Sequence, residues 1–198
     1  MTEAAPPTVR LEHIAVGQAR PWSVGGRRIL SAYGKQRVDG PVQAHALGLA
    51  GDEQADLSVH GGLHKAVYAY PLEHWPLWER ERAAALGPLD PTLPPGFLGE
   101  NLGIRGLLEH QVWIGDELHF AHAVLRVTAP REPCFKFTQA MGWPQAARTM
   151  VDHAACGWYC AVVQAGPLCA GEAATLVAGP RGLSVREAFL AKKLKHLR

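Results

Sequence analysis

The stretch Val124-Leu125-Arg126-Val127-Thr128-Ala129-Pro130-Arg131-Glu132-Pro133-Cys134-Phe135-Lys136 joins a strand pattern to a chemically distinctive end. Its first residues form a short, mostly apolar run with the alternation of a half-buried strand. Each proline fixes its own φ and pushes the preceding residue toward extended backbone. The stretch therefore predicts a strand that leads to a single cysteine, Cys134, with Arg131 and Lys136 close to it in sequence.

Cys134 is the first candidate for a functional side chain. The neighbouring cations favour the thiolate, so this thiol should ionise more easily than an isolated one. A thiolate acts either as a nucleophile or as a ligand for a soft metal. The competing interpretation is a small buried hydrophobic residue, which is the usual role of a lone cysteine. The local sequence leaves these alternatives open.

The rest of the chain shows many short strand patterns and few helical ones. Helices are expected at residues 73–86, at 144–155 and from 184 to 197, where Ser184 and Glu187 have capping-box spacing. This balance predicts a mainly β, barrel-like domain with a few peripheral helices and one C-terminal helix. The expected strands are residues 9–16, 42–46, 66–70, 112–114, 117–120, 124–129, 158–163 and 173–177. A tight hairpin turn is expected at residues 114–117.

Composition restricts the class of protein. The 198 residues predict one main domain over 9–180, with a flexible lead-in at 1–8 and an amphipathic helix at 181–198. The net charge of +2 favours neither a nucleic-acid polymer nor a membrane surface as partner. No apolar run reaches spanning length and no leader pattern begins the chain, which predicts a cytoplasmic protein. The remaining cysteines, at 156, 160 and 169, lack zinc-site spacing and are expected to be core or surface thiols.

Several loop residues could bind an anionic ligand. Gly61-Gly62 permits close backbone approach and could cradle an anion, with His60 and Lys65 as cationic donors beside it. Lys35 is a further candidate phosphate partner, and Asn101 could contact a polar ring edge. Each has an ordinary alternative, namely a tight turn or a solvated side chain. Two aspartates, at 52 and 56, could form an acid–base pair but are expected to cap turns.

The ordered series of motifs resembles the MOSC domain, the C-terminal module of molybdenum-cofactor sulfurases, and is most similar to its YiiM-like branch. The resemblance covers residues 9–180. It includes Gly48-Leu49-Ala50-Gly51-Asp52-Glu53-Gln54-Ala55-Asp56, His60-Gly61-Gly62, Gly99-Glu100-Asn101-Leu102, Pro130-Arg131-Glu132-Pro133-Cys134 and Gly157-Trp158-Tyr159. Members of that branch usually add a three-helix C-terminal module, of which only one helix is expected here.

The resemblance implies a β-barrel that binds molybdopterin, with Cys134 as the protein ligand to molybdenum and the catalytic residue. It implies Lys35, His60, Lys65 and Arg131 as contacts to the phosphate and pterin, and Asn101 as a pterin or substrate contact. The implied activity is reduction of N-hydroxylated compounds, such as hydroxylaminopurines, with electrons from a separate flavin or iron–sulfur protein. The alternative is a cofactor carrier or sulfur-transfer protein that uses the same cysteine. The oligomeric state, a homodimer included, stays open.

Overall fold

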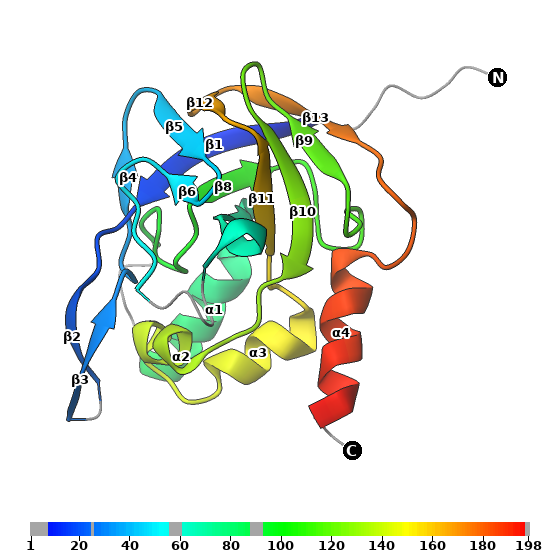
Figure 1. Ribbon diagram of the computed structural model, residues 1–198. Helices are drawn as coiled ribbons and strands as arrows, with labels where there is room; N and C mark the ends of the chain where they lie inside the picture. The colour runs from blue at the N-terminus through cyan, green and yellow to red at the C-terminus, as the bar shows by residue number, and fades with distance from the viewer. Residues whose placement is uncertain (1–7, 25, 56–60, 88–92, 197–198) are drawn as a thin grey trace.

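The computed structural model describes residues 8–24, 26–55, 61–87 and 93–196 (Figure 1). The helices are α1 (Trp75–Leu86), α2 (Phe135–Met141), α3 (Ala146–His153) and α4 (Val185–His196), with short 3-10 turns at Leu63–Lys65 and Leu72–His74. The strands are β1 (Thr8–Val16), β2 (Arg20–Val24), β3 (Arg27–Ser31), β4 (Gln36–Val38), β5 (Val42–His45), β6 (Gly48–Leu49), β7 (Val67–Pro71), β8 (Leu102–Arg105), β9 (Glu117–His119), β10 (Val124–Pro130), β11 (Trp158–Gln164), β12 (Gly166–Leu168) and β13 (Ala173–Val177).

Seven of the described strands close into a barrel in the order β13-β9-β10-β11-β7-β8-β1. Strand β1 closes it, because its middle pairs with β8 and its first residues pair with β13, where Thr8 lies opposite Thr175. Only β7 and β8 pair in parallel among these neighbours; the others are antiparallel. Strand β4 extends the sheet from the end of β1. The mainly β barrel expected from the sequence is confirmed.

The barrel interior is packed with apolar side chains from alternating strand positions. In β1, Val9, Leu11 and Ala15 are fully buried at positions that fit its period-two pattern, and Ile14, which follows the register shift between Leu11 and His13, is buried as well. Helices α1, α2 and α3 lie together at one end of the barrel (Figure 1). Trp78 of α1 is fully buried: its ring centroid lies 5.5 Å from that of Phe137 in α2, and its indole N–H donates to the Tyr70 hydroxyl of β7 at 2.5 Å, which joins the helices to the barrel. This arrangement places the end of β10 and the start of α2 beside the barrel opening.

Helix α4 begins with the expected capping box. The Ser184 backbone N–H donates to Glu187 Oε2 at 2.8 Å, and the Glu187 N–H donates to Ser184 Oγ at 3.2 Å. Val185 and Phe189 are fully buried, so this end of the helix docks on the barrel. Leu190 is half-buried and packs against the core, while the side chains of residues 193–198 lie outside the described part of the chain. Of the flexible lead-in expected at residues 1–8, Thr8 already belongs to β1, where it lies opposite Thr175, and residues 1–7 lie outside the described part.

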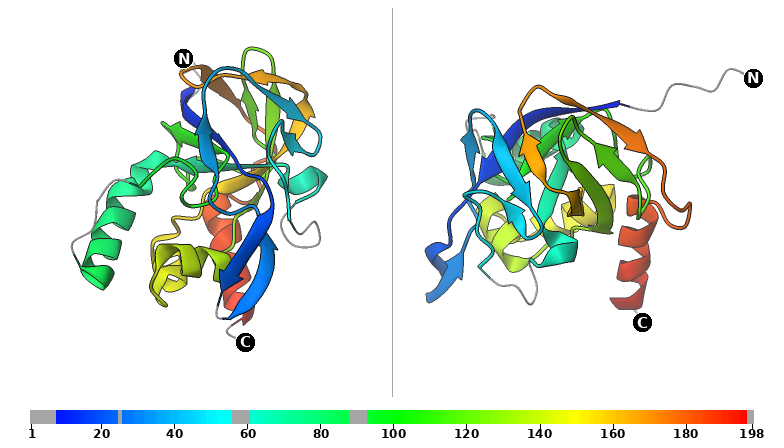
Figure 2. Two further views of the ribbon diagram at one scale, coloured as in Figure 1. Left: turned by 90° about the vertical axis from the view of Figure 1, so that its left-hand side faces the viewer. Right: turned by 45° about the horizontal axis from the view of Figure 1, so that its top comes forward.

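Several features differ from the sequence expectations. Residues 112–114 do not form a strand: Trp113 makes only an isolated bridge with Ser184, so the turn that follows it does not close a hairpin. The paired strands β2 and β3 were not expected, and they form a hairpin that stands away from the barrel (Figures 1 and 2). Strands β4, β6, β8 and β12 and helix α2 were also not expected. In the described residues no helix has the length and apolar character needed to cross a membrane.

Candidate functional site

A pocket with an empty volume of about 650 Å³ opens beside the end of β10. Five of the six residues proposed from the sequence line it: Lys35, Lys65, Asn101, Arg131 and Cys134. They come from the β3–β4 loop, the 3-10 turn before β7, the residue before β8, and the segment between β10 and α2. His60 lies outside the described residues. The fold thus gathers side chains that are far apart in sequence around one opening.

Arg131 follows β10 directly and lies beneath the pocket with only 4% of its surface exposed. Its guanidinium carbon lies 5.2 Å from the centroid of the Tyr68 ring and 5.3 Å from that of Phe137, within cation–π range. Burial alone would lower the pKa of Arg131, but the net direction is upward because three phenol groups and the Cys134 thiol face it. Its Nη1 is buried without a hydrogen-bond partner among the described residues. Such a donor is costly unless a ligand meets it.

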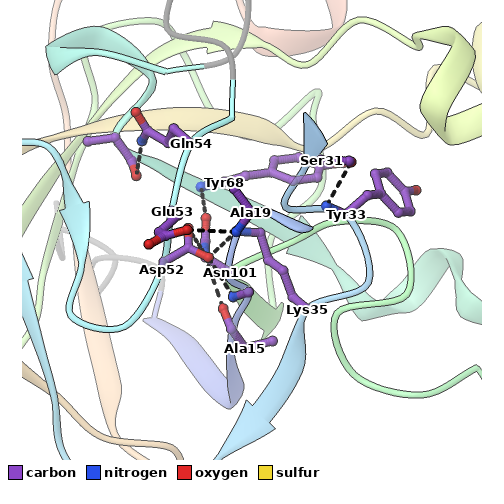
Figure 3. A network of polar contacts seen from close by, with 12 residues as sticks. Ala15, Ala19, Ser31, Tyr33, Lys35, Asp52, Glu53, Gln54, Tyr68 and Asn101 are labelled. Carbon is purple, nitrogen blue, oxygen red and sulfur yellow. Dashed lines mark hydrogen bonds and ion pairs between the residues drawn. The ribbon is translucent and has the colours of Figure 1, made fainter. Parts of the chain in front are cut away.

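Tyr33 forms part of the pocket wall and has a second orphaned group. Its hydroxyl is buried and makes no hydrogen bond of good geometry within the described structure, although it faces the Arg131 guanidinium. Burial raises its pKa, and the nearby Arg131 opposes this shift without reversing it. The Tyr33 backbone N–H donates to Ser31 Oγ at 3.1 Å, which fixes the start of this loop (Figure 3). The two orphaned donors, on Tyr33 and Arg131, therefore line the same pocket as Cys134.

Lys35 reaches into the pocket as a buried partner of Asp52. Its ammonium group forms an ion pair with Asp52 Oδ1, and only 9% of the Lys35 side chain is exposed. Burial lowers the pKa of Lys35, although the neighbouring carboxylate favours the charged form. Asp52 Oδ1 also accepts the Gly17 N–H at 2.8 Å, so Asp52 makes the backbone contact expected of it in addition to the charge pair. Figure 3 shows Asp52 between Lys35 and Asn101.

Asn101 uses its side chain to join two strands. Its Oδ1 accepts the Tyr68 N–H at 3.1 Å, and its Nδ2 donates to Ala15 O at 3.1 Å and to Asp52 Oδ2 at 2.9 Å. Its backbone makes two parallel contacts, because its N–H donates to Tyr68 O and its C=O accepts from Ala15 N–H. Figure 3 shows the side chain at the centre of this network. Both amide hydrogens thus bond within the protein, which gives Asn101 a positioning role that the sequence did not indicate.

The loop that carries Lys65 is held by Gln54. Its Oε1 accepts the Gly62 N–H at 3.0 Å, and its Nε2 donates to Leu47 O at 2.9 Å. The Gly62 N–H is therefore occupied, so the expected cradle of successive free N–H groups is not present at this residue. The Lys65 ammonium lies 5.6 Å from the centroid of the Tyr159 ring, which places a cation on the pocket wall.

Cys134 stands at the junction of β10 and α2. It is half-buried and has extended backbone (φ −128°, ψ 170°), and its C=O accepts the Thr138 N–H as α2 begins. The other buried thiols differ in character: burial raises the pKa of Cys160 to about 12 and raises that of Cys156. Both belong to the hydrophobic core. Cys134 is thus the cysteine that lines the pocket, while those two are neutral core residues.

Comparison with known proteins places this architecture in a family. Residues 56–175 match the model of the MOSC domain. The chain belongs to the MOSC domain family. The MOSC protein is 37% identical over 160 residues to Protein YiiM from Escherichia coli, a match that covers 80% of this chain and 69% of YiiM. It also resembles the crystal structure of YiiM from Geobacillus stearothermophilus, with a TM-score of 0.74, 26% identity, and coverage of 96% of this chain and 86% of that one.

A third relative carries an enzymatic name. The MOSC protein is 36% identical over 172 residues to a protein named Reductase from Gibberella moniliformis. This match covers 86% of this chain but 29% of the reductase. The chain therefore corresponds to less than a third of that protein. Together the relatives identify a YiiM-like MOSC protein related to molybdenum-cofactor proteins.

Proposed function

We propose that this pocket binds the molybdenum cofactor and that the protein reduces N-hydroxylated small molecules. The observation that carries the proposal is the pair of buried, unpartnered donors, Arg131 Nη1 and the Tyr33 hydroxyl, in the pocket that Cys134 also lines. Buried donors without partners are rare in folded proteins, and their presence supports a polar ligand at this place. The MOSC family relationship suggests which ligand that is.

The donor set fits a phosphate-bearing group with a soft metal. Arg131 presents a fixed charged fork suited to phosphate oxygens, and Lys65 adds a second cation on the pocket wall. The Tyr33 hydroxyl can donate to a polar atom of the ring system. Cys134 supplies the thiolate sulfur that molybdenum would take as its protein ligand. His60, proposed from the sequence as a further contact, stays a prediction.

The reaction requires electrons and protons in equal number. Conversion of R–NHOH to R–NH₂ and water consumes two electrons and two protons as the N–O bond breaks. The cofactor supplies two-electron chemistry when bound, and an external flavin or iron–sulfur protein would supply the electrons. Asp52 favours the protonated form of Lys35 and keeps its ammonium in place inside the pocket, whereas burial lowers the pKa of Lys35 and so makes this ammonium a stronger acid. Lys35 is therefore the residue we expect to deliver a proton to the departing oxygen.

The test is to purify the protein from a host that makes the cofactor and to measure molybdenum and pterin per chain. We expect both in the wild type, loss of molybdenum in Cys134→Ser, and loss of pterin in Arg131→Met. Arg126→Met is the matched control, because Arg126 is an exposed arginine of β10 paired with Glu117. A wild-type protein without molybdenum would refute cofactor binding. A loaded protein that cannot reduce 6-hydroxylaminopurine with an artificial reductant would refute the reductase function and favour a cofactor carrier.

A further inference from the structure

A second cleft adjoins the pocket and has no role in the function proposed above. Its empty volume is about 1210 Å³, and it shares Ser31, Tyr33 and Lys35 with the first pocket. It is lined by the β2–β3 hairpin, by β4, by the segment before β8 and by Ala140 of α2. Two views show that the hairpin stands apart from the barrel on the side of α2 (Figures 1 and 2). The unpartnered Tyr33 hydroxyl belongs to the wall that both cavities share.

The lining of this cleft combines flat apolar surfaces with positive charge. Trp22 and Phe97 provide aromatic rings beside Pro21, Pro94 and Pro95, while Arg20 and Arg37 provide cations. None of the described residues that line it is Asp or Glu. The Trp22 ring already stacks on Tyr33, with centroids 5.9 Å apart and an interplanar angle of 20°. A further planar ring can extend this stack, since aromatic side chains bind nucleobases face to face.

The charge of the cleft suits an anion more than a neutral ligand. Arg37 has one carboxylate neighbour, Asp39, at 3.4 Å, and both side chains are exposed, at 55% and 92%. Exposed pairs of this kind contribute little, so a phosphate with its higher charge can take the guanidinium. Lys35 is committed to Asp52 and lies at the boundary with the first pocket. The exposed cations of this cleft thus lie on β2, which carries Arg20, and on β4, which carries Arg37.

We propose that this cleft binds a nucleoside 5′-monophosphate, so that the substrate of the enzyme is an N-hydroxylated nucleotide. The base stacks against Trp22 beside Tyr33, and the phosphate pairs with Arg37. The shared wall directs the exocyclic N–OH group toward the pocket that Cys134 lines. The proposal rests on the proposed reductase function for its substrate, but nucleotide binding itself can be measured without cofactor.

The first experiment is calorimetric titration of the purified protein with AMP, adenosine, adenine and inorganic phosphate. We expect AMP to bind about tenfold or more tightly than adenosine, because the phosphate adds at least one charge-assisted hydrogen bond. Arg37→Ala should remove this difference and leave adenosine binding unchanged. Trp22→Ala should weaken both ligands about tenfold, and Trp22→Phe should restore most of the affinity.

Arg10→Ala is the matched control. Arg10 is an exposed arginine of β1 that lies 3.4 Å from Glu12, the same separation as in the Arg37–Asp39 pair, and it does not line the cleft. The affinity of the Arg10→Ala variant for AMP should equal that of the wild-type protein. Equal binding of AMP and adenosine by wild type, or an effect of Arg10→Ala as large as that of Arg37→Ala, would overturn the proposal.

A kinetic experiment separates this proposal from the proposed function. With loaded enzyme and an artificial reductant, the N-hydroxylated nucleotide should have a KM about tenfold below that of the free base, and Arg37→Ala should remove this advantage without changing kcat. Protein that contains molybdenum and reduces both substrates with equal KM would overturn the nucleotide proposal alone. Protein that binds AMP but holds no molybdenum would overturn the reductase function alone. A nucleotide attached to the released pterin, without AMP binding, would assign the cleft to the cofactor and overturn the substrate proposal.

Discussion

Replacement of Asn101 by alanine tests whether this residue joins the barrel strands or serves mainly as a ligand contact. Asn101→Ala removes the acceptor of the Tyr68 N–H and the donor to Ala15 C=O, both at 3.1 Å. Tyr68 is 4% exposed and Ala15 is fully buried, so neither backbone group regains a partner from solvent. Each buried group left unpaired costs about 1–3 kcal/mol, so we expect the free energy of unfolding to fall by about 4 kcal/mol. That is a large part of the roughly 5–15 kcal/mol that stabilises a domain.

Urea denaturation followed by far-UV circular dichroism measures this loss. The midpoint should fall while the m-value stays constant, because the surface exposed on unfolding is the same. Gln164→Ala is the control: it removes an exposed side-chain hydrogen bond to His122 O and should change the unfolding free energy by less than about 0.5 kcal/mol. A loss below about 1 kcal/mol for Asn101→Ala would refute the strand-bridging role. Unchanged stability with loss of bound pterin would instead make Asn101 a cofactor contact.

Three further changes test the fold and its titrating groups. Burial raises the pKa of Tyr68 and Tyr70, so both phenols stay protonated in the folded protein while they ionise in the unfolded chain above about pH 10. The free energy of unfolding should therefore be constant below about pH 10 and fall above it by about 2.7 kcal/mol per pH unit for the two residues together. Gradual formation of tyrosinate, measured by absorbance at 295 nm before the protein unfolds, would contradict this. Gly103→Ala would place a Cβ 2.1 Å from the His13 ring and should destabilise by about 3 kcal/mol, and a wild-type urea midpoint would exclude the clash. Ser184→Ala breaks the capping box and should lower the melting temperature by about 3 °C in calorimetry, whereas an unchanged value would mean that the cap adds no stability.

The sequence predicted the elements whose side chains have a buried and an exposed face. The first five residues of β1 alternate between core and solvent, and α4 carries its own cap, so each element has a local signal in the sequence. The β2–β3 hairpin has no fully buried position among the described residues of β2, and it contains Pro21, so neither periodicity nor propensity indicated it. Residues 112–114 are apolar enough to suggest a strand, but in the fold only Trp113 forms a bridge, with Ser184, and no neighbouring strand pairs with the segment.

The candidate site was predicted best where its residues are close in sequence. Arg131 and Cys134 are separated by two residues, so one motif revealed both. The tyrosines around Arg131 come from separate segments, and nothing in their local sequence indicates that they meet. Asn101 was predicted as a ligand contact because its amide is versatile, but only the barrel shows that β1 and β7 already use it. Residues that act through tertiary contacts are therefore the ones that sequence patterns miss.

The closure of the barrel by β1 has a consequence for how the chain folds during synthesis. Residues from the first strand pair with residues of β13, with Thr8 opposite Thr175. Because this pairing joins segments near opposite ends of the sequence, the loop it closes spans most of the chain, and such contacts form slowly. A nascent chain on the ribosome has an open edge at β1 until β13 has emerged. The ribosome must therefore have translated the chain as far as β13 before the barrel can close.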